Sequence, residues 1–233
     1  MDLVDTRSHW IPPGTVVLVP VGSTEQHGPH LPFDTDTLIA EAVARGVMGR
    51  MPPGRALLAP PLVYGASGEH QDFAGTISIG TEALAAVLLE LGRSISTWAS
   101  VVVFVNGHGG NVDALNAATE RLRFEGRDAL WVPCMPVHGD AHAGRTETSV
   151  LLYLHPSRVV PDRAPVGRVE RLDALLPELR EKGVRAVSPN GVLGDPSGAS
   201  AAEGKTLLEQ MIAGATRRLG ARGEPAAPGS QSS

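Results

Sequence analysis

The sequence has a single cysteine and lacks any long hydrophobic segment. Cys134 has no partner within the chain, which excludes an intramolecular disulfide framework and a zinc site built from several thiolates. A lone cysteine suits the reducing cytosol, and we expect Cys134 to be a small, buried apolar residue. No run approaches the ~18 to 20 apolar residues of a membrane span, and the opening MDLVDTRSHW lacks a signal-peptide pattern. We therefore expect a cytoplasmic protein.

Clusters of positive charge are also missing. The formal net charge is −5 and the basic residues are scattered, so we expect neither nucleic acid nor a membrane as a partner. A small molecule or a peptide is the expected substrate. The 233 residues are 42% hydrophobic, enough for one core, and we predict a single catalytic domain over residues 1–219. Residues 220–233 are rich in Gly, Pro and Ser and are predicted to form a disordered tail without function.

Four short, β-branched hydrophobic runs predict strands at residues 15–21, 56–59, 101–105 and 129–132. They lack polar alternation, which is typical of a parallel sheet covered on both faces. Apolar residues at three- and four-residue spacing predict helices at 37–48, 81–98, 111–124 and 146–154. Ser200 and Glu203 predict a capping box that opens a last helix ending near Leu219. The alternation predicts an α/β protein, a three-layer α/β/α domain around a mostly parallel sheet. Residues 155–199 show only weak periodicity, and we assign them no fold.

Candidate metal ligands follow the first predicted strand. The segment PVGSTEQHGPHLPFDTD contains five of them, namely Glu25, His27, His30, Asp34 and Asp36. In an extended segment, residues two apart project to the same side, so Glu25 and His27 can face one cluster of ions. The glycine and prolines that follow allow a turn, which can bring Asp36 back to the same place.

Two further clusters resemble the first in their position. In VVVFVNGHGGN, His108 directly follows a predicted strand, and the neighbouring glycines let the backbone come close to a ligand. In GDAHAGRTETS, Asp140, His142 and Glu147 surround the start of a predicted helix. Because ligands bind at the carboxyl ends of strands in open parallel sheets, loops after different strands can meet there. The glycine-rich loop lacks both the GxxxxGK[ST] lysine and the GxGxxG spacing, so we do not expect a nucleotide site.

Oxygen and imidazole ligands without thiolates suit zinc, manganese or ferrous iron, and one carboxylate shared by two ions is the usual construction of a dinuclear hydrolytic site. Taken singly, each of these residues has an ordinary alternative role, as a turn former, a helix N-cap or a hydrogen-bonded surface group. Together they favour a hydrolase that uses two divalent metal ions.

Four motifs, GSTEQHGPHLPFDTD, GASGEHQDFAGTISI, VNGHGGN and HAGRTETS, occur here in the order that is typical of the creatininase (creatinine amidohydrolase) family, which the chain resembles over about residues 14–155. The resemblance implies a creatininase-like fold and hydrolysis of an amide C–N bond. It also implies that Glu25 and His108 bind one metal, that His27 binds the other, and that Asp36 bridges them. Relatives form ring-like homo-oligomers, so a homo-oligomer is expected.

The sequence departs from creatininases proper at two places. They carry Tyr-Glu where this chain has Gly109 and Gly110, and the missing glutamate is a ligand of their second metal. Our hypothesis is that Glu147 replaces it. They also carry tryptophan where this chain has His138, so creatinine itself is not the expected substrate.

The resemblance assigns His142 as the general acid or base, within H-x-G-x-x-E-T-S; the alternative is a hydrogen-bonded histidine at a helix N-terminus. Glu69 and His70 lie in the loop with which the family binds substrate, where they either contact the substrate or only order the loop. The overall likeness is greatest to family members that trim a modified precursor peptide, which implies a small modified peptide as substrate, cut next to its C-terminal Val-Tyr unit. The alternatives are a formamide deformylase, a cyclic-amide hydrolase or a metal-binding scaffold without turnover.

Overall fold

The central sheet contains four parallel strands. The computed structural model describes residues 1–136 and 138–221. The strands run in the order β2–β1–β3–β4, and every neighbouring pair is parallel. Their bounds are β1 Val16–Val21, β2 Ala56–Leu58, β3 Val101–Asn106 and β4 Ala129–Pro133. Each strand matches the hydrophobic run that predicted it to within one residue at either end.

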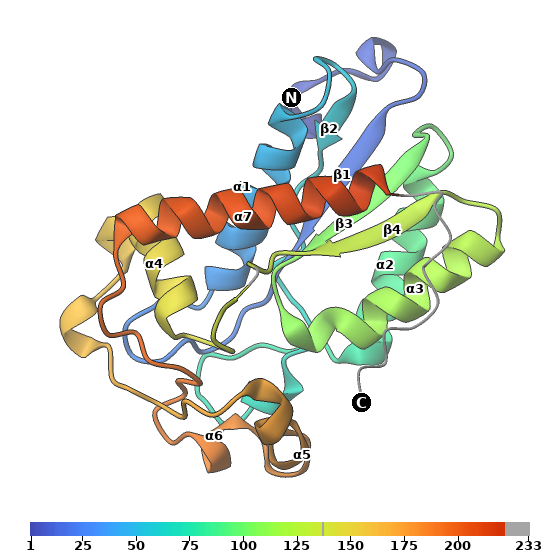
Figure 1. The fold of residues 1–233 in the computed structure, drawn as a ribbon. Coiled ribbons are helices and arrows are strands. Elements are labelled where there is room, and N and C mark those ends of the chain that lie inside the picture. The colour runs from blue at the N-terminus through green and yellow to red at the C-terminus, as the bar shows by residue number, and fades with distance from the viewer. Residues whose placement is uncertain (137, 222–233) are drawn as a thin grey trace.

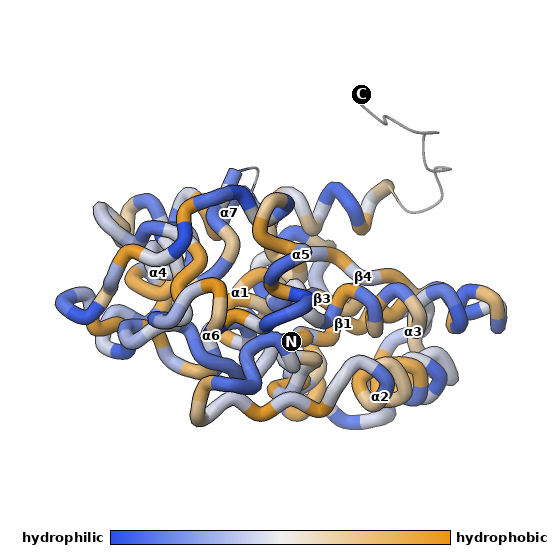
Figure 2. Tube along the Cα trace, turned by 90° about the horizontal axis from the view of Figure 1, so that it is seen from below, coloured by the Kyte–Doolittle hydropathy of each residue, from blue (hydrophilic) through white to orange (hydrophobic). Residues whose placement is uncertain are grey.

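Helices cover both faces of this sheet (Figure 1). Along β1, Val16 and Leu18 face one hydrophobic core, whereas Val17 and Val21 face the other. The first core is completed by α1 (Thr35–Gly49), α4 (Arg145–Leu154) and α7 (Ala201–Gly220), and the second by α2 (Thr81–Ile95) and α3 (Val112–Phe124). In Figure 2 the hydrophobic colour is concentrated in the central strands, and the flanking helices alternate. The predicted three-layer α/β/α fold is confirmed.

Side chains determine where the last helix, α7, begins and how it is held against α4. The Ser200 hydroxyl caps α7 by accepting the backbone N–H of Glu203 at 3.2 Å. The predicted capping box is only half formed, because the Glu203 carboxylate does not return to the cap. It accepts hydrogen bonds from Arg145 Nε, at 2.8 and 2.9 Å, and from Ser149 Oγ at 3.1 Å. These bonds tie α7 to α4.

The first helix begins at Thr35, two residues before its predicted start, α3 and α4 each start within one residue of their predictions, and the ends of α2 and α7 also differ from the predictions. The helix α2 ends at Ile95 rather than Trp98, because the chain tightens there into hydrogen bonds that span three residues, from Thr97 to Ser94 and from Trp98 to Ile95. The helix α7 extends through Gly220, which was predicted to begin the tail. Residues 222–233 of that predicted tail lie outside the described residues.

Two further sequence predictions concern Cys134 and membrane-spanning helices. Cys134 is buried, as expected, and burial raises the pKa of its thiol. Among the residues that the structure describes, no helix is long and apolar enough to cross a membrane.

The segment left without a fold, residues 155–199, contains α5 (Leu172–Lys182) and α6 (Val184–Val187) together with the single 3-10 turns η5 (Pro156–Arg158) and η6 (Pro161–Arg163). The two helices form a small separate core with Phe73 packed against it, made of Leu175, Leu179, Val184, Val187 and Leu193. They contact η3 (Gly68–His70), and in Figure 1 they lie beyond the carboxyl ends of the strands. The segment therefore covers the end of the sheet where the candidate ligands gather.

Candidate metal centre

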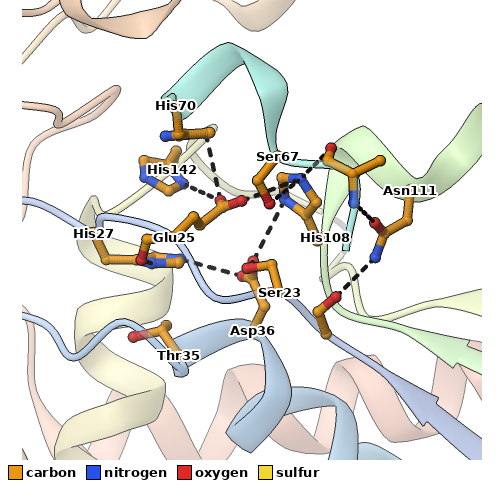
Figure 3. A network of polar contacts seen from close by, with 12 residues as sticks. Ser23, Glu25, His27, Thr35, Asp36, Ser67, His70, His108, Asn111 and His142 are labelled. Atoms are coloured by element: carbon orange, nitrogen blue, oxygen red, sulfur yellow. Dashed lines mark hydrogen bonds and ion pairs between the residues drawn. The ribbon is translucent and has the colours of Figure 1, made fainter. Parts of the chain in front are cut away.

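Loops from two neighbouring strands bring the predicted ligands together (Figure 3). Glu25 and His27 lie in the loop after β1, and Asp36 lies in the first turn of α1. His108 follows β3, which pairs with β1 in the sheet. The side chains of all four are buried. The site lies at the carboxyl ends of the strands, as the parallel topology predicts.

The start of α4 adds a third group to the site. The backbone of His142 forms an antiparallel bridge with Leu193, with N–H···O=C distances of 3.1 and 2.9 Å. Ala143 follows with a positive φ of 53°, which is strained for a residue with a side chain. Its N–H donates to Glu147 Oε2 at 2.6 Å. The sharp turn before α4 therefore directs Glu147 back toward the loop after β1.

Glu25 is the buried centre of the cluster. Three imidazole nitrogens face its carboxylate: His108 Nε2 at 3.2 Å, His70 Nε2 at 3.4 Å and His142 Nδ1 at 3.7 Å. Even so, neither oxygen accepts a hydrogen bond from any described residue. Burial raises the pKa of Glu25, but His108 and His70 outweigh it and lower the pKa to about 2. An ionised, buried carboxylate whose hydrogen bonds are not satisfied is costly unless an imidazolium or a metal ion neutralises it.

His27 presents a metal-ligand geometry. Its Nδ1 lies 3.1 Å from the backbone oxygen of Glu25, which can only accept, so Nδ1 carries the proton. In the neutral ring Nε2 is then unprotonated, and it faces Asp36 Oδ1 at 3.2 Å and Glu147 Oε2 at 3.8 Å. Nε2 and two carboxylate oxygens converge without repulsion only when a proton or a metal ion lies among them. A ring nitrogen fixed by a backbone carbonyl is also how metal-binding histidines are usually held.

Asp36 lies between the two histidines. Its Oδ1 faces His27, and its Oδ2 lies 3.4 Å from His108 Nδ1. The Ser23 hydroxyl donates to the same Oδ2 at 2.6 Å and so orients the carboxylate. Burial raises the pKa of Asp36, but His27 outweighs it and lowers the pKa to about 2. Asp36 therefore has the position and the charge that a bridging ligand needs.

The pKa values of His27 and His108 show that nearby carboxylates favour positive charge on both rings. Burial lowers the pKa of His27, but Asp36, Glu147 and Glu25 together outweigh it and raise the pKa to about 10. Burial also lowers the pKa of His108, but Glu25, Asp36 and Glu69 together outweigh it, with the same result, about 10. Each carboxylate therefore attracts positive charge into the cluster, which a proton or a metal ion can supply.

The donor set fits divalent metal ions. Potential ligand atoms lie within 4.8 Å of one another in three overlapping sets: Glu25 with His27 and Asp36, His27 with His142 and Glu147, and Glu25 with His70 and His142. Imidazole nitrogens and carboxylate oxygens are the donors that zinc, manganese and ferrous iron accept. Glu147 is the least acidic carboxyl of the group, because burial raises its pKa to about 7.

The loop after β3 leaves no room for a side chain at Gly110. A Cβ atom there would overlap the backbone oxygen of Ala66 and come within 2.7 Å of Glu69 Oε1. Glu69 Oε1 also lies 3.5 Å from His108 Nε2. The carboxylate of Glu69 thus approaches the space in which the glutamate of creatininases proper would begin. His70, from the same turn, is buried against Glu25.

Three of the residues that the sequence singled out do not join the cluster. His30 Nε2 contacts the Thr148 hydroxyl at 2.9 Å, and Asp34 forms an ion pair with Arg158 at the surface. Asp140 accepts the backbone N–H groups of Arg145 and Thr146 and so caps α4. These are the ordinary roles of histidine and aspartate in turns and at helix starts.

Sequence reasoning missed one residue that lies among the ligands. Gln26 is buried, and its side-chain nitrogen lies 2.9 Å from His70 Nδ1 and 3.1 Å from His142 Nε2. The signal was its place between Glu25 and His27, but an amide does not ionise and did not enter a search for ligands.

Comparison with known proteins gives the same assignment as the motifs. The creatinine amidohydrolase family model matches residues 4–219. The mycofactocin precursor peptide peptidase of Mycobacterium ulcerans (strain Agy99) is 59% identical over 210 residues, which are 87% of this chain and 84% of that protein. A deformylase of Methanothermobacter thermautotrophicus, acting on 2-amino-5-formylamino-6-ribosylaminopyrimidin-4(3H)-one 5'-monophosphate, is 32% identical over 70% of this chain and 64% of its own length.

A solved structure of creatininase with Mn superimposes with a TM-score of 0.71 and 26% identity, over 91% of this chain and 92% of that one. The family match spans nearly all the described residues, and the fold, the motif order and the relatives agree. The chain therefore belongs to the creatininase family, and it is a hydrolase of amide C–N bonds, as the sequence predicted.

Proposed function

We propose that this enzyme is a metal-dependent peptidase that cleaves the modified C-terminal Val-Tyr unit from the mycofactocin precursor peptide. The observation that carries the proposal is the 59% identity to a mycofactocin precursor peptide peptidase over 84% of that protein's length. The likeness to the deformylase is weaker, at 32% identity. A cytoplasmic location and assembly as a homo-oligomer belong to the same proposal.

Two divalent ions are proposed as cofactors, Zn²⁺ and/or Fe²⁺, with Mn²⁺ as an alternative. Glu25 and His108 would hold one ion and His27 the other, and Asp36 would be shared between them. Glu147 completes the second site, for which the 3.8 Å distance between its Oε2 and His27 Nε2 is the support. Such ions would supply a more acidic water and a polarised amide carbonyl.

A side chain of the protein would carry the proton that hydrolysis transfers from water to the leaving amine. Hydrolysis forms a C–O bond from water and breaks the C–N bond, so one proton must pass from the water to the departing amine nitrogen. His142 Nδ1 faces the cluster, 3.7 Å from Glu25 Oε1, and is the proposed carrier. Burial holds the pKa of His142 well below its usual value, so the ring is neutral before the reaction begins.

Glu69 and His70 are the proposed substrate contacts. The side chain of Glu69 is 31% exposed although it reaches His108, so it borders both the cluster and the solvent. His70 is buried beside Glu25. They come from η3, against which α5 and α6 pack. A peptide that enters past Glu69 would meet this partly exposed carboxylate before the buried His70 and the ligands.

The proposed function is tested by identifying the cleavage products from their masses. Metal-free protein is reconstituted with Zn²⁺ or Fe²⁺ and incubated with modified precursor peptide, unmodified precursor peptide, the formylamino pyrimidine substrate and creatinine, and mass spectrometry reads the products. We expect release of the modified Val-Tyr unit from the modified peptide alone. Cleavage of the pyrimidine formamide instead would establish the deformylase. No turnover of any substrate would favour a metal-binding scaffold.

A further inference from the structure

Gln26 stands between two proposed ligands, but its side chain contacts neither of them. It is 6% exposed. Its amide meets two backbone groups and two histidine rings, which come from segments far apart in the chain: the turn η3, the approach to α4, and the loop at Gly191. Each of these partners restricts the hydrogen bonds that the amide can make.

Two backbone groups fix which end of the amide is oxygen. The N–H of Gly28 can only donate, and it lies 2.9 Å from Gln26 Oε1. The carbonyl of Gly191 can only accept, and it lies 3.0 Å from Gln26 Nε2. A side chain at Gly191 would overlap Gln26 Oε1, so this close approach needs a glycine. One N–H of the amide is thus donated to Gly191, and one remains.

The backbone of Gln26 fixes the tautomer of His142. The Nε2 atom of His142 lies 2.8 Å from the backbone oxygen of Gln26, which can only accept, so Nε2 carries the proton. The amide nitrogen of Gln26 at 3.1 Å is then a second donor and does not bond to that atom. The other ring nitrogen, Nδ1, is left unprotonated and faces Glu25 Oε1.

The side chain of Gln26 fixes the tautomer of His70. The remaining amide N–H has His70 Nδ1 within 2.9 Å, and that atom must accept it. The proton of the neutral ring is therefore on Nε2, which lies 3.4 Å from the same Glu25 Oε1. His70 presents a donor to the centre, and His142 presents an acceptor.

We propose that Gln26 is a positioning residue that sets opposite hydrogen-bonding roles for the two histidines beside Glu25. Its side chain makes His70 an N–H donor, and its backbone makes His142 a proton acceptor. The consequence for catalysis rests on the proposed function: the unprotonated Nδ1 of His142 can accept a proton during hydrolysis, while the N–H of His70 is directed at Glu25 Oε1 and orients that proposed ligand. Removing a partner that orients a ligand typically costs about 10- to 100-fold in activity or metal affinity.

The experiment compares ring tautomers and kinetics in Gln26→Glu and Gln26→Met. A carboxylate at position 26 offers no N–H, so Nδ1 of His70 must gain a proton to bond to it. Nitrogen-15 NMR of the imidazole rings, in metal-free and zinc-loaded protein, reports that change. The His142 tautomer is expected to stay as it is in both variants, because its partner is backbone. Gln210→Glu, on the exposed face of α7, is the matched control.

We expect Nδ1 of His70 to be unprotonated in the wild type and protonated in Gln26→Glu, with kcat lower by about 10- to 100-fold and KM changed less. Gln26→Met should leave His70 in mixed tautomers, and it serves as the test variant if Gln26→Glu fails to fold. A wild-type His70 with its proton on Nδ1, or variants with altered tautomers and full kcat, would overturn the proposal. If the tautomers are as stated but no peptide is cleaved by the wild type, the proposed function fails and the assignment of the rings stands.

Discussion

Glu147 Oε2 lies 3.8 Å from His27 Nε2, while it accepts the N–H of Ala143 at 2.6 Å. The contact joins the first turn of α4 to the loop after β1, and it depends on the positive φ of Ala143. A carboxylate therefore faces His27 even though Gly110 supplies none. This position supports the proposal that Glu147 takes the place of the glutamate that creatininases proper carry at the position of Gly110.

Replacing Glu147 with glutamine should remove one metal ion and leave the other. An amide keeps the size of the side chain but loses the charge that a divalent ion needs. After reconstitution with Zn²⁺, elemental analysis should show the metal content falling from two ions per chain to about one, with a matching loss of activity. Glu120→Gln, on the exposed face of α3, should retain both ions. Two tightly held ions in Glu147→Gln would assign the second site to other residues.

Replacing His142 with alanine should abolish most turnover without emptying the site. A general acid or base contributes typically ~10²- to 10⁴-fold, so kcat should fall within that range. The proposed ligands remain in place, and the metal content should be unchanged. Steady-state kinetics and elemental analysis of the same preparation measure both effects, with His9→Ala as an exposed control. Activity at the wild-type level would return His142 to a structural role.

The stability of the metal-free protein should fall as the solution becomes alkaline. The pKa values of His27 and His108 are raised to about 10, against burial, by Asp36 and Glu25. A raised pKa in the folded state stabilises fully below the unfolded value of ~6.5, and this contribution is lost as the pH rises toward 10. Bound metal replaces these protons. Denaturant unfolding at pH 6 and pH 9 should therefore show a loss above about 1 kcal/mol without metal and a smaller loss with Zn²⁺.

An equal loss in both forms would show that other groups carry the pH dependence. His27→Asn supplies the control within the cluster. In the metal-free state this variant lacks one of the two raised pKa values, so its stability should depend less on pH between 6 and 9. The comparison uses differences between variants, which are independent of the absolute stability.

The sheet and the ligand-bearing loops were predictable because their signals are local. Residues such as Val103 and Phe104 belong to runs with no polar alternation, and burial on both faces of the sheet explains that pattern. The helices α5 and α6 were not predictable in the same way. Their small core depends on Phe73 and Leu193, which lie in other parts of the chain, and too few of their own residues are buried to show a clear period.

In the site, too, the residues whose roles depend on near neighbours in the sequence were predictable, and those whose roles depend on distant segments were not. The spacing of Glu25 and His27 indicated a shared side, and the structure places both at the cluster. The spacing of Asp34 and Asp36 could not separate them, since the choice depends on Arg158, which pairs with Asp34. The role of Gln26 depends on contacts with distant segments of the chain. Sequence reasoning found the ionisable residues and missed the neutral amide that orders two of them.

Restoring glutamate at Gly110 should damage the site rather than recreate that of creatininases proper. A Cβ atom there would overlap the backbone oxygen of Ala66 and lie within 2.5 Å of His108 Nε2, so the loop or the ligand must move. Overpacking of this kind typically costs ~1 to 3 kcal/mol. Gly109→Ala is the matched control, because a Cβ at Gly109 meets no atom within 4 Å. Gly110→Glu should unfold at lower denaturant concentration and bind less Zn²⁺ than Gly109→Ala. Full metal content and stability in Gly110→Glu would show that the loop readily adopts a second conformation.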